Sequence, residues 1–98
     1  MVRYRLTPRA AQDLDDIGGY IARDNPVTAA RFVATLEMRL QLVADHPMAG
    51  RARRELSPDL RSIAFRRYVV FYRVRHGTVE IIRIVHGSRD IRRALTER

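Results

Sequence analysis

Three histidines are the first side chains to consider for chemistry, because imidazole exchanges a proton near neutral pH. They are His46, His76 and His86, and no spacing among them matches a metal site. His86 lies shortly before Arg89, just past the last strand-like segment, so this pair could perform acid–base chemistry beside a phosphate. A general acid or base also needs a positioned partner, and the sequence offers none. The residues therefore favour an interaction surface over a catalytic centre.

Other catalytic and cofactor-binding motifs are missing from the sequence. Ser57, Ser62 and Ser88 lack the context of a nucleophile elbow, and there is no P-loop or dinucleotide-binding fingerprint. The chain contains no cysteine, which excludes disulfides and thiolate metal sites. We therefore expect neither a cofactor nor a bound metal.

The net positive charge lies entirely in the second half of the chain. Residues 1–50 hold six arginines and six acidic residues, whereas residues 51–98 hold thirteen arginines and five acidic residues, which gives the net charge of +8. Every basic residue is Arg, whose guanidinium group binds phosphate or carboxylate through two hydrogen bonds. A GC-rich genome would explain Arg in place of Lys, but not the confinement of the excess to one half. The distribution indicates an anionic partner, either nucleic acid or an acidic protein.

The first half of the chain predicts one short strand and two helices. Apolar residues alternate with arginines over residues 2–6, as in a half-buried strand. Thr7 then caps a helix that starts at Pro8, and Asn25 caps a second helix that starts at Pro26. The connection between these helices is so short that they must pack antiparallel, as a helical hairpin.

Two groups of residues in the first helix call for an interpretation. Gly18 and Gly19 are adjacent in the helix interior, which indicates either a break or a close contact with the neighbouring helix. Asp13, Asp15 and Asp16 lie in the early turns, where negative charge compensates the helix dipole. Because Asp15 and Asp16 cannot share one face, we expect the three carboxylates to be solvated.

Three strand-like segments occupy residues 60–65, 68–74 and 78–86. The whole chain, residues 1–98, is therefore predicted to form one α+β domain of order β-α-α-β-β-β, with the helical hairpin packed on one face of a small, mainly antiparallel sheet. No apolar stretch approaches the length of a membrane span or a signal peptide. We therefore expect a cytoplasmic protein without membrane contact.

A two-residue turn at residues 76–77 sets the register of the last two strands. The resulting pairs join opposite charges and apolar partners, which supports this register. The pairs run from Arg75–Thr78 through Val74–Val79, Arg73–Glu80, Tyr72–Ile81 and Phe71–Ile82 to Val69–Ile84.

This register divides the sheet into one face for the helices and one free face. The helix face receives Tyr68, Val70, Tyr72, Val74, Val79, Ile81 and Val85. The free face receives the apolar strip Val69, Phe71, Ile82 and Ile84, framed by Arg73, Arg75 and Glu80. An apolar strip with a charged rim is typical of a protein-binding groove, although the C-terminal tail or dimerisation could cover it instead. Arg83 falls on the helix face, where we expect it to pair with Asp13 or Asp16.

Short motifs spread over nearly the whole chain point to a known family. They are residues 61–63, 67–74 and 79–87 with Arg89–Asp90 behind them, YRLTPRA at 4–10, DLDDI at 13–17, and His46–Pro47 and Gly50–Arg51 after the second helix. Their content and order closely resemble the ParE branch of the ParE/RelE toxin superfamily. This resemblance implies a toxin of a type II toxin–antitoxin pair, silenced in a hetero-oligomer by a ParD-like antitoxin encoded beside it.

The two branches of this superfamily act differently. RelE-type relatives cleave mRNA on the ribosome, whereas characterised ParE-type toxins poison DNA gyrase. The RelE-type site uses basic residues on the second strand and directly after the leading Tyr of the third, an Arg beyond the last strand and often a C-terminal Tyr. Here Val69 follows Tyr68 and no Tyr follows Arg89, so only Arg61 and Arg89 match. The resemblance therefore favours a gyrase poison that is not an enzyme.

Three functions remain open. The favoured one is a gyrase poison whose target-binding residues are Arg66, Arg67, Arg89, Arg92 and Arg93. The second is a ribosome-dependent mRNA endonuclease whose catalytic candidates are Arg61, His86 and Arg89. The third is a relative that binds antitoxin without being toxic. In each case we expect the antitoxin on the free face, at Val69, Phe71, Arg73, Ile82 and Ile84.

Overall fold

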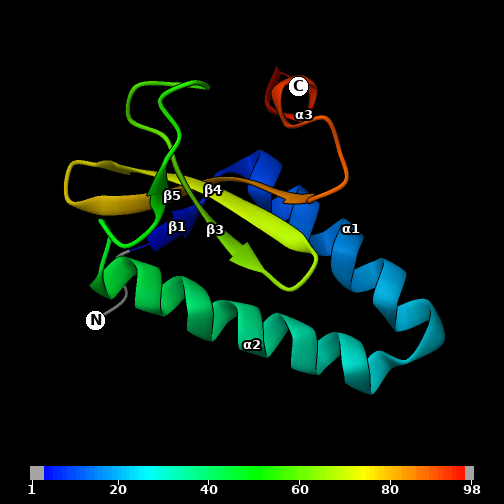
Figure 1. The fold of residues 1–98 in the computed structure, drawn as a ribbon. Helices are drawn as coiled ribbons and strands as arrows, with labels where there is room; N and C mark the ends of the chain where they lie inside the picture. The colour runs from blue at the N-terminus through cyan, green and yellow to red at the C-terminus, as the bar shows by residue number, and fades with distance from the viewer. Residues whose placement is uncertain (1–3, 97–98) are drawn as a thin grey trace.

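The computed structural model describes residues 4–96, and its element order matches the predicted β-α-α-β-β-β chain with two additions (Figure 1). The elements are β1 (Tyr4–Leu6), α1 (Pro8–Asp24), α2 (Pro26–Asp45), β2 (Arg51–Ala52), β3 (Arg61–Phe65), β4 (Tyr68–Arg75), β5 (Thr78–His86) and α3 (Ile91–Thr96). The additions, β2 and α3, are too short to show a hydrophobic period in the sequence. Val2, part of the predicted first strand, lies outside the described residues. Within residues 4–96, no helix is long and apolar enough to cross a membrane.

The two long helices form the predicted antiparallel hairpin (Figure 1). The Thr7 hydroxyl accepts a hydrogen bond from the Ala10 N–H at 3.1 Å, and the Asn25 side chain accepts one from the Thr28 N–H at 3.1 Å. Both caps satisfy backbone donors that the first helical turn leaves unpaired. α1 continues unbroken through both glycines, so the alternative of a break is wrong. An added Cβ at Gly18 would lie 3.7 Å from Val33 of α2, an ordinary packing distance, and one at Gly19 would meet nothing within 4 Å, so close helix contact does not require these glycines.

The five strands form one sheet in the order β1-β5-β4-β3-β2. β1 pairs parallel with β5, while the remaining pairs are antiparallel, so the first strand of the chain lies beside the last. Helices α1 and α2 cover one face, and α3 lies on the opposite face (Figure 1). We keep the name "free face" for the side of the sheet opposite α1 and α2.

The register of β4 and β5 is correct near the turn and wrong beyond it. The predicted pairs from Arg75–Thr78 to Tyr72–Ile81 are present, but a bulge follows, and Phe71 then pairs with Arg83 instead of Ile82. Val69 accordingly pairs with Val85 instead of Ile84. One extra residue in β5 exchanges the faces of the residues that follow, so Ile84 packs in the core under the helices and Val85 lies on the free face.

The bulge lies where β5 loses its neighbour on the other side. The pairing with β1 ends at Ile81, whose carbonyl accepts the Thr7 N–H at 3.0 Å, and the Thr7 hydroxyl donates to the Ile82 carbonyl at 3.1 Å. Beyond this point the Asp13 carboxylate of α1 accepts the Ile84 N–H at 2.9 Å. A side chain from α1 therefore satisfies a backbone donor that no strand pairs.

Arg83 is buried and joins three elements. The prediction that it lies on the helix face is wrong, because the bulge pairs it with Phe71 and so turns it to the free face, beside Ala94 of α3. The Arg83 Nε donates to Asp13 Oδ2 at 2.7 Å, and a second guanidinium nitrogen donates to Oδ1 at 3.2 Å. A third donates to the Ala94 carbonyl in α3. The pairing with Asp13 is confirmed, whereas the expectation of a solvated carboxylate cluster is wrong for Asp13, which is buried; only Asp15 and Asp16 are exposed.

Candidate functional site

The free face is largely covered by the chain itself. Leu60, Phe71, Val85 and Ala94 form a buried cluster on it, packed against Leu56, Val69, Ile82, Ile91 and Leu95. The predicted accessibility is therefore wrong for Phe71, which has no exposed surface, and for Ile84, which is in the opposite core. The C-terminal tail provides much of the cover, as the alternative interpretation stated.

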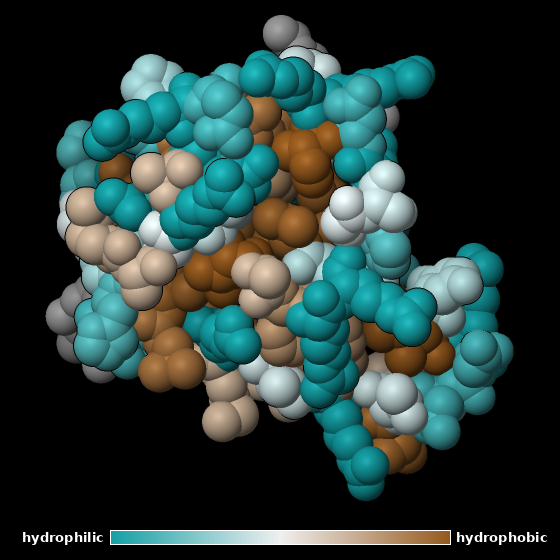
Figure 2. Space-filling view, in the orientation of Figure 1, coloured by the Kyte–Doolittle hydropathy of each residue, from teal (hydrophilic) through white to brown (hydrophobic). Residues whose placement is uncertain are grey.

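A hollow remains on the free face between the loop before β3 and α3. We call it the α3 groove; its lining is Leu56, Ser57, Asp59, Leu60, Arg73, Ile82, Leu95 and Thr96, and its volume is about 230 Å³. Figure 2 shows apolar side chains gathered in the middle of the visible face, with hydrophilic ones around them. Arg73 and Ile82 of the predicted antitoxin residues thus line an open groove, while Val69 is half-buried in the adjoining cluster.

The five predicted target-binding arginines belong to two segments that are hydrogen-bonded to each other. Arg66 and Arg67 form the turn between β3 and β4, and the Arg67 carbonyl accepts the Gly87 N–H at 2.8 Å. Arg89 follows in the loop after β5, and Arg92 and Arg93 are in α3. All five are exposed. We call these residues the basic end.

Two contacts fix the shape of the basic end. The Arg66 guanidinium lies over the rings of Phe32 and Phe65, at 5.5 and 5.3 Å from their centroids. Asp90 begins α3 by accepting the Arg93 N–H at 3.2 Å. Cation–π stacking and the helix cap therefore hold positive charges at defined positions on the surface.

His86 lies beside the basic end with its ring orientation fixed. Its Nδ1 accepts the Ser88 N–H at 3.1 Å and lies 2.7 Å from the Ser88 hydroxyl, and the ring packs edge-on against Tyr68 at 5.4 Å. The Arg89 N–H donates to the His86 carbonyl at 3.0 Å. Because a backbone N–H can only donate, Nδ1 carries the lone pair and Nε2 the proton in this arrangement.

The three catalytic candidates do not meet. Arg61 pairs with Tyr72 across β3 and β4, whereas His86 pairs with Tyr68, four residues earlier in β4, which corresponds to about 13 Å of strand. The Arg61 guanidinium also donates to the Gly50 carbonyl at 2.7 Å and to the Met48 carbonyl at 3.3 Å. Arg61 thus anchors a loop at one end of the sheet, and the structure brings only His86 and Arg89 together.

A family model described as the ParE toxin of the type II toxin–antitoxin system parDE matches residues 4–91. The chain belongs to this family. It is a ParE-type toxin of a type II system, as the resemblance predicted.

Relatives of this toxin match most of its length. It is 40% identical over 93 residues to Toxin ParE1 of Caulobacter vibrioides, a match that covers 94% of this chain and 96% of the relative. It is 34% identical over 89 residues to Toxin RelE2 of the same organism, covering 91% and 99%. A solved structure titled chromosomal ParDE TA system from P. aeruginosa aligns with a TM-score of 0.64 and 26% identity, covering 88% of this chain and 96% of that one.

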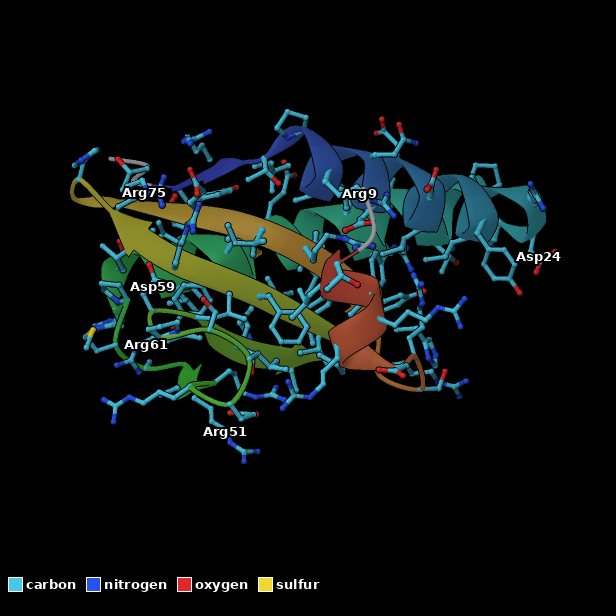
Figure 3. All side chains as sticks on the ribbon, turned by 90° about the horizontal axis from the view of Figure 1, so that it is seen from above. Arg9, Asp24, Arg51, Asp59, Arg61 and Arg75 are labelled. Atoms are coloured by element: carbon cyan, nitrogen blue, oxygen red, sulfur yellow. The ribbon has the colours of Figure 1, made fainter. Side chains whose placement is uncertain are left out.

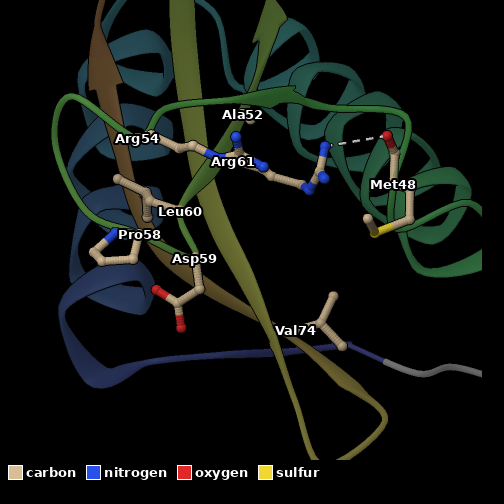
Figure 4. A pocket seen from close by; sticks show the side chains of 8 residues that line it. All are labelled: Met48, Ala52, Arg54, Pro58, Asp59, Leu60, Arg61 and Val74. Carbon is tan, nitrogen blue, oxygen red and sulfur yellow. Dashed lines mark hydrogen bonds between the residues drawn. The ribbon is translucent and has the colours of Figure 1, made fainter.

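The toxin has a second hollow, which the sequence did not indicate, at the end of the sheet where Arg61 lies (Figure 4). We call it the loop hollow; its lining is Met48, Ala52, Arg54, Pro58, Asp59, Leu60, Arg61 and Val74. Val74 was predicted on the helix face, but 41% of it is exposed. Its pairing with Val79, which lies in the core under the helices, keeps Val74 on the predicted face, and its exposure shows that the helices do not cover this end of β4.

The loop beside this hollow is held by a buried tyrosine. The Tyr72 hydroxyl accepts the Gly50 N–H at 2.9 Å and donates to the Pro47 carbonyl at 2.8 Å. Burial raises the pKa of Tyr72 above its usual value of 10.0, an effect larger than the opposing influence of the Gly50 hydrogen bond and the Arg61 charge. The neutral hydroxyl, which can donate and accept at once, is therefore the form that fixes the loop.

One buried carboxylate of the toxin balances two arginines on neighbouring strands. Glu80 of β5 pairs with Arg73 of β4 at 2.9 Å and with Arg5 of β1. Burial alone would raise the pKa of Glu80, but the Arg73 hydrogen bond and the charges of Arg5, Arg73 and Arg75 together lower it below 4.5. No group of three His, Asp or Glu side chains within residues 4–96 could hold a metal ion.

Proposed function

We propose that this toxin binds and poisons DNA gyrase and does not cut RNA. A ParD-like antitoxin encoded beside it holds it inactive in a hetero-oligomer. The toxin acts in the cytoplasm. One observation carries the mechanism: Arg61 is engaged with loop carbonyls at the end of the sheet opposite His86. Two cations without a partnered acid and base can stabilise charge but cannot move the protons that RNA cleavage requires.

The basic end is the proposed contact with the target. Its five exposed arginines can bind carboxylates or phosphates on the gyrase–DNA complex through paired hydrogen bonds. Their long-range field would also speed association, because the chain carries a net charge of +8. The target itself comes from the family resemblance, and the geometry supports a binding role for this surface.

The α3 groove is the proposed contact with the antitoxin, in place of the wider strip predicted from the sequence. Ile82 offers an apolar contact and Arg73 a guanidinium at the groove, with Val69 in the adjoining cluster. An apolar antitoxin side chain buried here would contribute about 1.5–3 kcal/mol. Phe71 contributes indirectly, because it supports the groove from below while buried.

A reconstituted assay tests the mechanism. Purified toxin is added to gyrase and plasmid DNA, and in parallel to translating ribosomes with a defined mRNA. We expect gyrase-linked DNA breaks and intact mRNA, and we expect added antitoxin to abolish the breaks. Cleavage within the mRNA reading frame would instead assign the toxin to the endonuclease branch. If neither DNA breaks nor mRNA cleavage is detected and the antitoxin still binds, the chain is a non-toxic antitoxin-binding relative.

A further inference from the structure

The loop hollow combines exposed apolar side chains with one fixed guanidinium group, that of Arg61, and the proposed function leaves this hollow without a role. Met48 and Val74 are 68% and 41% exposed, and Leu60, also in the lining, is buried. Arg61 extends across the hollow toward Met48, held there by its bonds to the Met48 and Gly50 carbonyls (Figure 4). An apolar depression with a charged margin has the composition of the centre and rim of a protein interface.

The size of the loop hollow fits one side chain of a partner protein. Its volume is about 210 Å³. Pockets for drug-sized molecules and cofactors begin at roughly 300 Å³ and are more enclosed by apolar side chains. A single large apolar residue that enters such a depression is the usual anchor of a protein–protein contact. The hollow is therefore suited to an anchor residue and is too small for a cofactor.

The charges around the loop hollow specify what flanks that anchor. Arg54 is exposed and makes no ion pair or hydrogen bond to any side chain between residues 4 and 96. Arg51 and Arg75 are exposed too, but they lie well apart from each other and outside the lining (Figure 3). Asp59 is the one acidic residue of the lining. A second copy of this chain would carry the same net charge of +8 and would be repelled. A phosphate backbone would leave the apolar side chains of the hollow without a matching contact.

We propose that the loop hollow binds a segment of the antitoxin that carries one large apolar side chain flanked by carboxylates. The α3 groove and the loop hollow share Asp59 and Leu60, so a chain seated in the groove can reach the hollow across the loop at 57–60. The inference thus rests on the proposed antitoxin partner and specifies the chemistry of its second anchor. The carboxylates lie toward Arg54 and Arg61, on the side away from Asp59 (Figure 4).

The test uses full-length toxin variants and the full-length antitoxin encoded beside the toxin, with affinity measured by calorimetry at low and high salt. Val74→Glu places a charge in the hollow and is expected to weaken binding about tenfold or more. Val27→Glu, the same substitution at an exposed position at the start of α2, is the matched control and is expected to bind as the wild type does.

A charge-reversal pair tests the margin of the hollow. Arg54→Glu is expected to weaken antitoxin binding severalfold at low salt and less at high salt, because the contact is electrostatic. Arg31→Glu changes the net charge equally on an exposed part of α2 and should have a smaller effect. Circular dichroism confirms that each variant is folded before its affinity is interpreted.

Three results would overturn the inference, and they are distinguishable. If the antitoxin binds Val74→Glu as tightly as the wild type, the hollow is not an anchor site, while the antitoxin partner stands. If the antitoxin does not bind the wild-type toxin, the partner and the inference fail together. If Arg54→Glu loses affinity for a short random DNA duplex but keeps its affinity for antitoxin, the hollow margin is a nucleic-acid surface.

Discussion

The two ends of the sheet use the same residue type in different ways. At the basic end, Arg66, Arg67 and Arg93 are exposed on a turn and a short helix, where their charge is available to a distant partner. At the loop hollow, Arg61 is fixed by two backbone carbonyls and helps to shape an apolar depression. An excess of arginine in a sequence predicts that the protein attracts anions. The sequence does not tell which arginines stay exposed to a partner and which, like Arg61, hold a loop in place.

The largest expected effect comes from neutralising the basic end. The triple variant Arg89→Ala, Arg92→Ala, Arg93→Ala should abolish gyrase-linked DNA breaks, because it removes three exposed charges from the proposed target contact. Gel analysis of plasmid DNA after incubation with gyrase measures the loss. The antitoxin affinity of this variant should change much less.

The matched control removes the same charge from the other end. The triple variant Arg51→Ala, Arg54→Ala, Arg75→Ala lowers the net charge equally and leaves the basic end intact, and it includes Arg54 of the loop hollow. It should still poison gyrase while binding antitoxin more weakly. If both triple variants lose toxicity to the same extent, net charge alone matters, and the functional division between the ends is wrong.

Arg83 tests how much the buried ion pair behind α3 stabilises the fold that carries the basic end. Arg83→Met should lower the free energy of unfolding by about 3–5 kcal/mol, because it leaves the Asp13 carboxylate buried without its main partner. Urea denaturation followed by circular dichroism measures the change. Arg9→Ala removes the more exposed partner of Asp13 and should cost about 1 kcal/mol or less. Equal losses in the two variants would contradict this account.

Tyr72 tests the support of the loop hollow. Tyr72→Phe should lower the free energy of unfolding by about 1–3 kcal/mol, because the Gly50 N–H and the Pro47 carbonyl lose a buried partner. Limited proteolysis should show faster cleavage in residues 46–50, while gyrase poisoning by the basic end is retained. Tyr20→Phe, at a 69% exposed position, is the matched substitution and should be neutral in both measurements.

Acid should weaken the part of the sheet that Glu80 holds together. Its pKa is lowered in the folded protein, so its contribution to stability is complete above about pH 4.5 and is lost as the pH falls through the folded-state pKa. Urea denaturation at a series of pH values from 7 to about 3 measures this loss. Glu80→Gln should be less stable at pH 7 and less sensitive to acid. An unchanged acid sensitivity in that variant would assign the loss to other carboxylates.

The smallest effect is expected for His86. Its Nδ1 is occupied by Ser88, and no partnered acid or base completes a proton-transfer site in the proposed mechanism. His86→Ala should therefore leave gyrase poisoning and growth inhibition unchanged. If this variant loses toxicity and the wild type cleaves mRNA, His86 takes part in RNA cleavage beside the basic end, and the binding mechanism is wrong.

The sequence determined the elements that depend on local rules. Thr7 and Asn25 cap the two helices where predicted, because capping needs only a side-chain oxygen and the first helical turn. The turn at 76–77 fixed the first pairs of β4 and β5, because register propagates from a tight turn. The pairing of Arg83 with Asp13 was also predictable, since a buried guanidinium requires a carboxylate and few were within reach.

The tertiary structure decided which surfaces remain open. The bulge at Ile82 coincides with the end of β1, a neighbour in space that is distant in the chain, so no periodicity within β5 could place Ile84 in the core and Val85 on the free face. The cover over Phe71 comes from α3 and the loop before β3, elements too short to show a pattern. Hollows form where several such segments meet, so their shape depends on contacts between residues far apart in the chain, and local sequence rules do not contain those contacts.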